Sequence, residues 1–318
     1  MKDFCVVGSG IAGSTIANLL AKKYSVEVFD KARGAGGRAA NRRYKKKLSF
    51  DHGVQYISSN NKDFIKTLKK NKIIKEWTGT HLDFTFKKNK KNLKYICKRG
   101  NNDISKYFLK NIKTNFTSCV KNIKFQKKFW QITLENQKKV YFKNLILAIP
   151  YPQLKKLAKK YLNKQLLNLN INMEPNLTFM LEYKNSKNIS ISSIKFQNSV
   201  IAWAANENSK NRFKSKNQLW TLQATEEWSK KNINKYKHNK KLKIKIVLDQ
   251  FEKLLKFKKK DNVFNNIHGW KYSYNKNPLK FKSYWSKKSM LGVCGDWFSG
   301  PKAEDAFISA RNLFEKIR

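Results

Sequence analysis

The sequence predicts an α/β fold with two sheet-containing units, and three observations support this prediction. The chain opens with an apolar strand, a glycine-rich turn and an amphipathic helix in direct succession. A later apolar strand, NLILAIP at 144–150, is stopped by proline, as expected for the end of a buried strand. Between 178 and 224 lie further strands rich in aromatic and aliphatic residues. We therefore expect a Rossmann-type domain and a second domain with a mixed sheet.

The opening stretch DFCVVGSGIAG contains the pattern G-x-G-x-x-G but almost no reactive side chains. Its glycines interrupt the apolar run that a secretory signal would need. Ser14 stands where a nucleotide-triphosphate loop requires lysine. The remaining interpretation is a strand at 4–7 that turns into a helix from about 11 to 23.

In this interpretation the backbone binds the pyrophosphate of a dinucleotide. Gly8 permits a tight turn, Gly10 lets the pyrophosphate approach, and Gly13 lets the helix pack closely on the strand. The anion then lies at the positive end of the helix, on the free N–H groups of a first turn that includes Ile11 and Ala12.

The next apolar strand, 25–29, ends in Asp30, about twenty positions beyond the glycines. An acid at this position is expected to bind the hydroxyls of an adenosine ribose, with Lys31 beside it. A glycine turn in an ordinary strand–helix unit is the alternative. The strand, helix, second strand and acid in this order favour a dinucleotide.

A second glycine-rich segment, KARGAGGR at 31–38, follows at once, although a nicotinamide-binding unit does not need one. Together with DHGVQY at 51–56, it resembles the FAD-binding entry of the amine-oxidase-like flavoproteins. In that family the glycines carry the chain past the pyrophosphate and close to the isoalloxazine ring, and the arginine neutralises the pyrophosphate. The FAD contacts that the resemblance implies are Gly37, Arg38, Gly53, Val54 and Gln55.

The C-terminal segment supplies the matching piece. MLGVCGD at 290–296 predicts a short buried strand that ends in Gly295 and Asp296, and 303–314 predicts a closing helix. In the flavoproteins that the chain resembles, this aspartate binds ribityl or ribose hydroxyls. The helix start directs its partial positive charge at the flavin pyrimidine edge. The helix residues implied are Glu304, Asp305 and Ala306.

Motifs along nearly the whole chain resemble the bacterial renalase-type FAD oxidoreductases. They are DKARGAGGR, DHGVQY, LILAIPYPQ at 145–153, WTLQATEEWS at 220–229, HGWKYS at 268–273 and GVCGDWFSGPKAEDAFISA at 292–310. Asp305 and Ala310 stand where that family often has glycine, and Gly269 stands where arginine is common. The cofactor is expected to be noncovalent FAD.

The resemblance also implies a discontinuous domain arrangement. Val120 would lie where the family passes its backbone near adenine. The FAD-binding domain is expected to comprise 1–58, 99–150 and 266–318, and the substrate domain 59–98 and 151–265.

The net charge of +48 raises a nucleic-acid hypothesis. The lysines, however, form many scattered short runs among abundant asparagine and isoleucine, which indicates a solvated surface. We expect neither nucleic acid nor a membrane as partner, and the sequence leaves the oligomeric state open. The positive potential could still steer an anionic substrate. Four cysteines without paired spacing indicate reduced thiols and a cytoplasmic protein.

Few side chains are obligatory in this class, because the flavin carries the reaction. His268 is the candidate catalytic residue, which would orient the hydride donor or adjust local charge; a structural role is the alternative. Gln55 would bind flavin or substrate. Trp203, Trp270 and Trp297 would form an aromatic floor or pack in the core. No metal site and no nucleophile elbow is predicted.

The predicted function is that of a renalase-type FAD-dependent oxidase. By resemblance, its substrate is a misreduced NAD(P), the 2- or 6-dihydro isomer, which would give NAD(P)+ and, with oxygen, hydrogen peroxide. The enzyme alternatives are an amine or polyamine oxidase, or a desaturase. The alternatives from another class are a lysine-rich nucleic-acid-associated protein and a flavin-binding protein without turnover.

Overall fold

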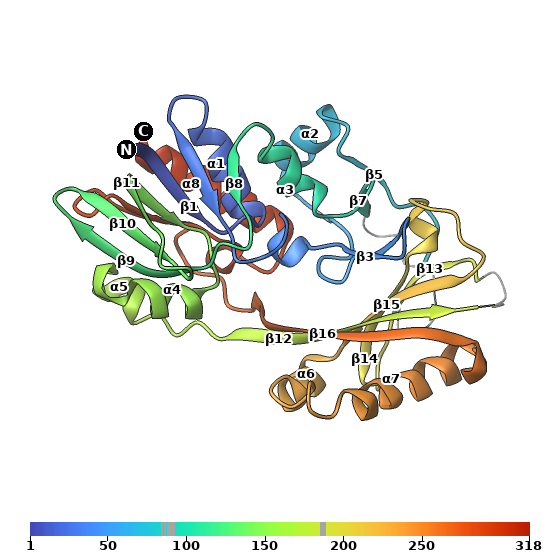
Figure 1. The fold of residues 1–318 in the computed structure, drawn as a ribbon. Helices are drawn as coiled ribbons and strands as arrows, with labels where there is room; N and C mark the ends of the chain where they lie inside the picture. The colour runs from blue at the N-terminus through green and yellow to red at the C-terminus, as the bar shows by residue number, and fades with distance from the viewer. Residues whose placement is uncertain (84, 86, 88–92, 185–188) are drawn as a thin grey trace.

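The computed structural model describes residues 1–83, 85, 87, 93–184 and 189–318, and it contains two main sheets (Figure 1). The first is eight-stranded, and most of its central pairs are parallel. Its strands in spatial order are β17 (Tyr284–Ser286), β18 (Leu291–Val293), β11 (Lys139–Leu147), β1 (Lys2–Val7), β2 (Val26–Phe29) and β8 (Lys113–Asn115), with β10 (Phe129–Leu134) paired to β11 and β9 (Val120–Gln126) paired to β10.

Strand β1 lies at the centre of this sheet, because its apolar residues pair on both sides. Val6 is opposite Ile146 of β11 and Val28 of β2. Strand β11 begins earlier than the predicted 144, because its first half forms an antiparallel hairpin with β10. Pro150 then caps the following helix, α4 (Tyr151–Ala158), and so separates strand from helix.

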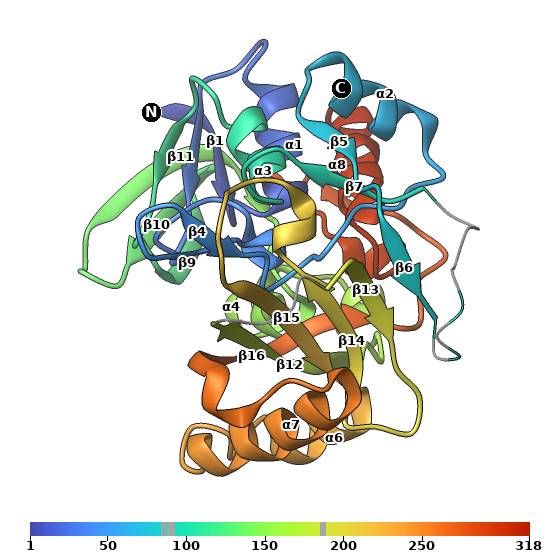
Figure 2. The ribbon, with the colours of Figure 1, turned by 90° about the vertical axis from the view of Figure 1, so that its right-hand side faces the viewer.

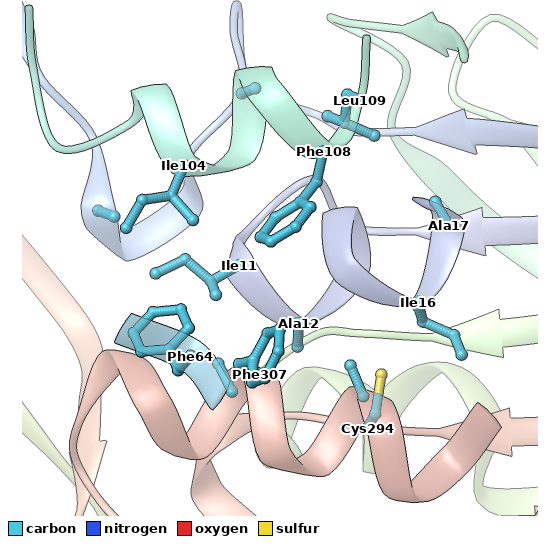
Figure 3. Close-up of a cluster of buried hydrophobic side chains, with 14 of the residues drawn as sticks. Ile11, Ala12, Ile16, Ala17, Phe64, Ile104, Phe108, Leu109, Cys294 and Phe307 are labelled. Atoms are coloured by element: carbon cyan, nitrogen blue, oxygen red, sulfur yellow. The ribbon is translucent and has the colours of Figure 1, made fainter. Parts of the chain in front are cut away.

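Helices cover both faces of the eight-stranded sheet. On one face, α1 (Ile11–Leu20) packs between α3 (Asp103–Phe108) and α8 (Ala303–Ile317), and Phe108 and Phe307 close the cluster around Ile11 and Ala12 (Figure 3). On the other face, α4, the 3₁₀ helix η2 (Lys159–Tyr161) and α5 (Lys164–Leu167) pack near the β9–β10 hairpin around the buried Trp130. This layering confirms the predicted α/β class.

The second sheet is six-stranded and largely antiparallel. Its strands in spatial order are β16 (Asn262–Asn275), β12 (Met173–Tyr183), β15 (Gln218–Ala224), β14 (Ile201–Asn206), β13 (Ile191–Lys195) and β6 (Thr80–Leu82). Helices α6 (Glu226–Asn232) and α7 (Lys240–Leu255) cover one face, whereas the other face is turned toward the first unit (Figure 2).

The remaining elements are short. They are α2 (Lys62–Lys70), the hairpin of β3 (Arg42–Tyr44) and β4 (Leu48–Phe50), the pair of β5 (Ile74–Glu76) and β7 (Tyr95–Cys97), and the 3₁₀ turns η1 (Gly37–Ala39), η3 (Asn208–Lys210), η4 (Lys259–Asp261) and η5 (Asp296–Phe298). Among the described residues, no helix has both the length and the apolar character needed to cross a bilayer.

Two parts of the expected domain division differ from the observed packing. Strand β16 pairs with β12 along its length, up to Asn275 opposite Met173, so the six-stranded sheet extends past the expected boundary at 266. Phe64 of α2 and Ile74 of β5 belong to the same core as α1 and α8, although 59–98 was expected in the substrate domain. The other boundaries stay a prediction.

Replacing Phe251 with alanine should test how strongly α7 holds the six-stranded sheet. Its ring is fully buried against Tyr183 and Trp220, so F251A should lower the free energy of unfolding by about 3–5 kcal/mol in urea. The control L242A removes an exposed side chain from the same helix and should change it by no more than about 0.5 kcal/mol. Equal losses in both variants would contradict this assignment of the core.

Candidate active site

The two glycine-rich turns predicted to contact a dinucleotide lie side by side. The Gly36 N–H donates to the Ser9 carbonyl at 3.1 Å. A Cβ on Gly37 would lie 3.0 Å from the Gly10 Cα. The two turns therefore form one surface of backbone atoms, with no side chain between Gly10 and Gly37.

This backbone surface lies at the N-terminus of α1. A Cβ on Gly13 would lie 1.9 Å from the Gly8 carbonyl oxygen, so only glycine lets the helix start this close to β1. The N–H groups of Ile11, Ala12 and Gly13 belong to the first turn, where a helix offers no carbonyl partners. Such an arrangement is suited to an anion such as a pyrophosphate.

Asp30, at the end of β2, is held against the first glycine turn. Its carboxylate accepts hydrogen bonds from the Ser9 N–H and hydroxyl, both at 2.6 Å, and from the Ala32 N–H at 2.8 Å. The Ser118 N–H donates to the Asp30 carbonyl at 2.8 Å, which brings the start of β9, at Val120, to the same edge. Exposed Lys31 follows directly.

Arg38 and Asp296, far apart in sequence, form an ion pair of 2.5 Å. The same guanidinium donates to the Ser273 carbonyl at 2.8 Å. The preceding Gly295 N–H donates to the Ser309 hydroxyl of α8 at 2.9 Å, which fixes the loop between β18 and the helix. The second glycine turn and the C-terminal Gly-Asp thus meet, although 258 positions separate Arg38 from Asp296 in the chain.

The side chains at the start of α8 bind protein groups. The Glu304 carboxylate accepts hydrogen bonds from the Ser59 hydroxyl at 2.6 Å and the Asn61 N–H at 2.9 Å. Asp305 accepts one from the Lys302 N–H at 2.8 Å, and Ala306 is buried in the core. Only backbone N–H groups of this first turn are left to face a cofactor.

The predicted flavin-facing turn, 51–55, is locked onto the second glycine turn. A Cβ on Gly53 would lie 1.9 Å from the Arg38 carbonyl oxygen, which also accepts the Val54 N–H at 2.9 Å. Gln223 of β15 donates to the Gly53 carbonyl at 3.1 Å. Strand β15 therefore helps to position the turn from the side of the six-stranded sheet.

Two buried polar atoms of this turn point to a missing partner. The Gln55 amide nitrogen donates to the Asp51 carbonyl, but its Oε1 is buried and, among the described residues, has no hydrogen-bond partner. The same is true of the His52 Nδ1 atom. Buried polar atoms are almost always paired, so both atoms are suited to a ligand that completes the site.

His268 of β16 lies in an aromatic cluster with His52 and Trp270. Its ring centroid is 4.9 Å from that of His52 and 4.4 Å from that of Trp270, and the Trp270 Nε1 donates to the His52 carbonyl at 2.8 Å. The HGWKYS stretch and the DHGVQY stretch are therefore in direct contact, and His268 faces the predicted flavin turn.

The surroundings of both histidines are positively charged. Burial, His268 and Arg42 lower the pKa of His52 to about 3. Burial, Arg42 and Lys237 also lower the pKa of His268. Both rings are therefore neutral at physiological pH. The charges that act on His268 are those of Arg42 and Lys237, whereas at His52 the Asp51 carboxylate partly opposes the effect of Arg42.

The directions of side chains bear on two further expectations, the aromatic floor that includes Trp297 and the role of position 269. Trp297 is buried against Phe298 and Tyr151 beneath the eight-stranded sheet, so it cannot share an aromatic floor with Trp270. A Cβ on Gly269 would lie 2.6 Å from the Tyr236 ring, on the face covered by α6 and α7. A side chain at 269 would thus point away from the cluster of His268.

A buried charge network beneath the turn was not foreseen. Lys210 donates to Asp51 at 2.9 Å and to Glu207 at 3.1 Å, and Arg212 pairs with the same Asp51 carboxylate. All four side chains are at most 2% exposed. Thr221 adds a hydrogen bond of 2.6 Å to Glu207. We call these four charged residues the buried charge network.

The network affects its two carboxylates in opposite directions: it lowers the pKa of Asp51, whereas burial and the neighbouring Asp51 charge raise the pKa of Glu207. Burial alone would raise the pKa of Asp51, but Lys210 and Arg212 hold it well below its ordinary value. Asp51 stands in the quoted DHGVQY stretch, so its neighbourhood was marked in the sequence. Nothing in the sequence distinguishes Lys210 or Arg212 among 69 lysines and arginines.

Taken together, the glycine cradle, Asp30 at one end and the unpaired atoms of Gln55 and His52 at the other fit an elongated dinucleotide with an aromatic ring system. Comparison with known proteins is consistent with a dinucleotide site. The family model described as "NAD(P)-binding Rossmann-like domain" matches residues 6–70 of this chain. Mouse (Mus musculus) renalase is 26% identical over 177 residues, which span 51% of each chain.

Solved structures show the same fold over the whole chain. A putrescine oxidase variant superposes with a TM-score of 0.76 at 10% identity, covering 99% of this chain and 98% of that one. A protein of Exiguobacterium sp. 255-15 that is assigned as a protoporphyrinogen oxidase gives 0.74 at 9% identity, with the same coverage. The chain is thus similar to renalase over about half of its length, and its fold is that of the two-domain oxidases in these solved structures.

The four cysteines of the chain are all free thiols. Cys5, Cys97 and Cys294 are buried, and burial raises the pKa of each. Cys119 is half-buried. Noncovalent attachment of the FAD stays a prediction.

Removing the central cation of the network should be costly. In K210M the carboxylates of Asp51 and Glu207 lose their shared partner in the interior, so the free energy of unfolding should fall by about 3–5 kcal/mol. The control K241M, on exposed α7, should change it by at most about 0.5 kcal/mol. Urea unfolding followed by tryptophan fluorescence measures both; a loss in K210M no larger than in K241M would overturn the burial argument.

Acid should destabilise the protein through His52. Its folded pKa of about 3 lies below the value of about 6.5 for an unfolded histidine, so between these values the unfolded chain binds more protons. The free energy of unfolding should therefore fall as the pH falls, by about 2–3 kcal/mol between about pH 6.5 and 4.5. Urea unfolding across this range measures it. H52Q should show a flatter pH dependence, and an unchanged slope would contradict this role.

Proposed function

We propose that the protein is an oxidase of misreduced nicotinamide dinucleotides. The substrate would be a 2- or 6-dihydro isomer of NAD(P), and the products NAD(P)+ and hydrogen peroxide. The matched part of mouse renalase spans only 51% of that protein, so this activity is inferred from the site. We place the protein in the cytoplasm, in line with its four free thiols.

The charge around the aromatic cluster carries the proposal. Arg42 and Lys237 are the charged groups that act on His268. The acid closest in sequence, Asp51, is buried and neutralised by Lys210 and Arg212. A positive potential at this site favours an anionic dinucleotide and disfavours a cationic amine.

The FAD would be held mainly by backbone. The glycine cradle and α1 would bind the pyrophosphate, Asp30 and the Val120 segment the adenosine end, and the 51–55 turn the ring system. The residues proposed to contact FAD are Gly8, Gly10, Ile11, Ala12, Gly13, Asp30, Lys31, Gly37, Arg38, Gly53, Val54, Gln55, Val120, Gly295, Asp296, Glu304, Asp305 and Ala306.

The FAD that these residues would hold would supply a hydride acceptor for the dihydronicotinamide and a route for both electrons to oxygen. The balance is one dihydro isomer, one oxygen molecule and one proton giving one NAD(P)+ and one hydrogen peroxide. The chain's contribution is orientation: the neutral His268 and Trp270 rings supply a surface on which the nicotinamide can lie. Because His268 is neutral, it holds the donor without adding a charge that would repel the oxidised, cationic product.

The same elements would also keep water out of the proposed site. Strand β16 and the 51–55 turn are joined by the Trp270–His52 hydrogen bond, and β15 by the Gln223–Gly53 bond. These contacts join the six-stranded sheet to the turn and would shield a nicotinamide bound there from solvent.

An amine or polyamine oxidase, or a desaturase, is the enzyme alternative. Putrescine oxidase has the same fold, and one of its solved structures contains putrescine, but its 10% identity carries no statement about substrate. The cationic surroundings of His268 speak against an amine donor. A silent flavin protein or a nucleic-acid-associated protein would lack turnover.

Anaerobic reduction of the bound flavin tests the proposal. We would purify the protein with FAD, record its visible spectrum, and mix it without oxygen with 2- and 6-dihydro NAD(P), with ordinary 4-dihydro NAD(P) as control, and with putrescine. Rapid bleaching by the 2- or 6-isomers alone is the expected result, followed by peroxide formation on admitting air.

Each other outcome points elsewhere. Bleaching by putrescine alone would replace the proposal with an amine oxidase. Bound flavin that no donor reduces would indicate a protein without turnover. A folded, FAD-supplemented protein that retains no flavin would overturn the enzymatic account.

A further inference from the structure

A cavity of about 790 Å³ opens between α2, the start of β7 and the residues just before α8. Its volume lies within the roughly 300–1,000 Å³ of small-molecule sites. Among the described residues, no carboxylate lines it. We call it the lysine pocket, because its lining includes Lys62, Lys66, Lys69, Lys70 and Lys302, together with Tyr95.

The sequence of α2 directs its lysines into this pocket. Asn61 caps the helix by accepting the Phe64 N–H at 2.8 Å. Phe64 and Leu68 are buried in the core beside α8. Lys62, Lys66 and Lys69, at helical spacing, are exposed on the other side.

The positive charges on the α2 side of the pocket are not balanced within the described part of the protein. Lys62, Lys66 and Lys69 form no ion pair there, although like charges one turn apart repel each other. Asp63, the acid of α2, pairs with Arg311 at 2.8 Å. By contrast, Lys230 on α6 pairs with two glutamates. An anion from outside would balance the pocket.

Glu304 is the nearest acid of α8, and its carboxylate is already bound. It accepts hydrogen bonds from the Ser59 hydroxyl and the Asn61 N–H, and it lies 3.4 Å from the Lys302 ammonium. This arrangement leaves the α2 lysines without a carboxylate and fixes the chain at 59–61 as the pocket wall.

The pocket adjoins the proposed flavin site from two directions. Ser58 lines it only three residues after Gln55, a stretch of chain that spans at most about 11 Å. Lys302 lines it directly before α8, whose first turn is proposed to face the flavin. A nicotinamide ring and its ribose would bridge such a gap.

We infer that the lysine pocket binds the phosphate groups of a nucleotide. Resting on the proposed function, that nucleotide is the dinucleotide substrate, whose nicotinamide lies at His268 while its phosphates lie among the lysines. Ammonium groups bind phosphate oxygens through charge-assisted hydrogen bonds, and the Lys69 ammonium lies 4.9 Å over the centroid of the Tyr95 ring at the pocket wall. The number of lysines favours the form that carries the additional 2′-phosphate.

Direct binding tests the pocket without relying on turnover. Calorimetry on the FAD-loaded protein would use adenosine 2′,5′-bisphosphate as the probe and adenosine as its uncharged counterpart. The variant K62A/K66A/K69A should raise the Kd of the bisphosphate about tenfold or more. The control K240A/K241A/K245A removes the same charge from α7, where Asp249 lies among the lysines, and should leave the Kd nearly unchanged.

Kinetics then connect the pocket to the substrate. The α2 variant should raise KM for the phosphorylated dihydro isomer about tenfold and leave kcat unchanged, because it changes binding and not hydride transfer. Equal Kd values in both triple variants would overturn the pocket and show only a diffuse effect of net charge.

Failure of the pocket and failure of the proposed function give different results. If the bisphosphate binds through the α2 lysines but no dihydronicotinamide reduces the flavin, the pocket stands and the proposed substrate falls. If the isomers reduce the flavin in every variant with the same KM, the proposed function stands and the pocket is overturned.

Discussion

The buried charge network is the interaction on which the relation between the two sheets depends. Asp51 comes from the N-terminal unit, whereas Glu207, Lys210 and Arg212 come from the connection between β14 and β15. Charges removed from water are tolerated only when each is paired and hydrogen-bonded, so few relative positions of the units satisfy all four. The network therefore also fixes the position of the turn that follows Asp51, which contains His52, Gly53 and Gln55.

The cofactor cradle relies on a different principle, the absence of side chains. Gly13 and Gly53 each lie within 1.9 Å of a carbonyl oxygen if given a Cβ, so backbone contact itself shapes the surface. Such a surface offers N–H groups in fixed positions and needs no rotamer to be ordered on binding. Rigidity at the pyrophosphate and rigidity at the ring thus arise from backbone contact in one case and charge pairing in the other.

The features that could be predicted from the sequence are those that depend on local pattern and spacing. The glycine pattern, the strand before it and Asp30 beyond it lie within one strand–helix–strand unit, so their contacts follow from short-range geometry. The fold class is confirmed, whereas FAD as the cofactor belongs to the proposed function. The contact between His52 and His268 was not predicted, because a turn of the N-terminal unit and strand β16 meet only in the folded chain. The residue-by-residue roles toward FAD stay predictions.

Long-range packing could not be predicted from a single chain. Lys210 resembles any surface lysine until the fold encloses it, and the length of β16 depends on its pairing with β12. The burial of three of the four thiols likewise depends on long-range packing, and it affects how readily the protein is oxidised. Peroxide attacks thiolates, so thiols kept protonated in the core resist it. An enzyme that releases peroxide beside its own flavin would thus be shielded from its product, with Cys119 as its most accessible thiol.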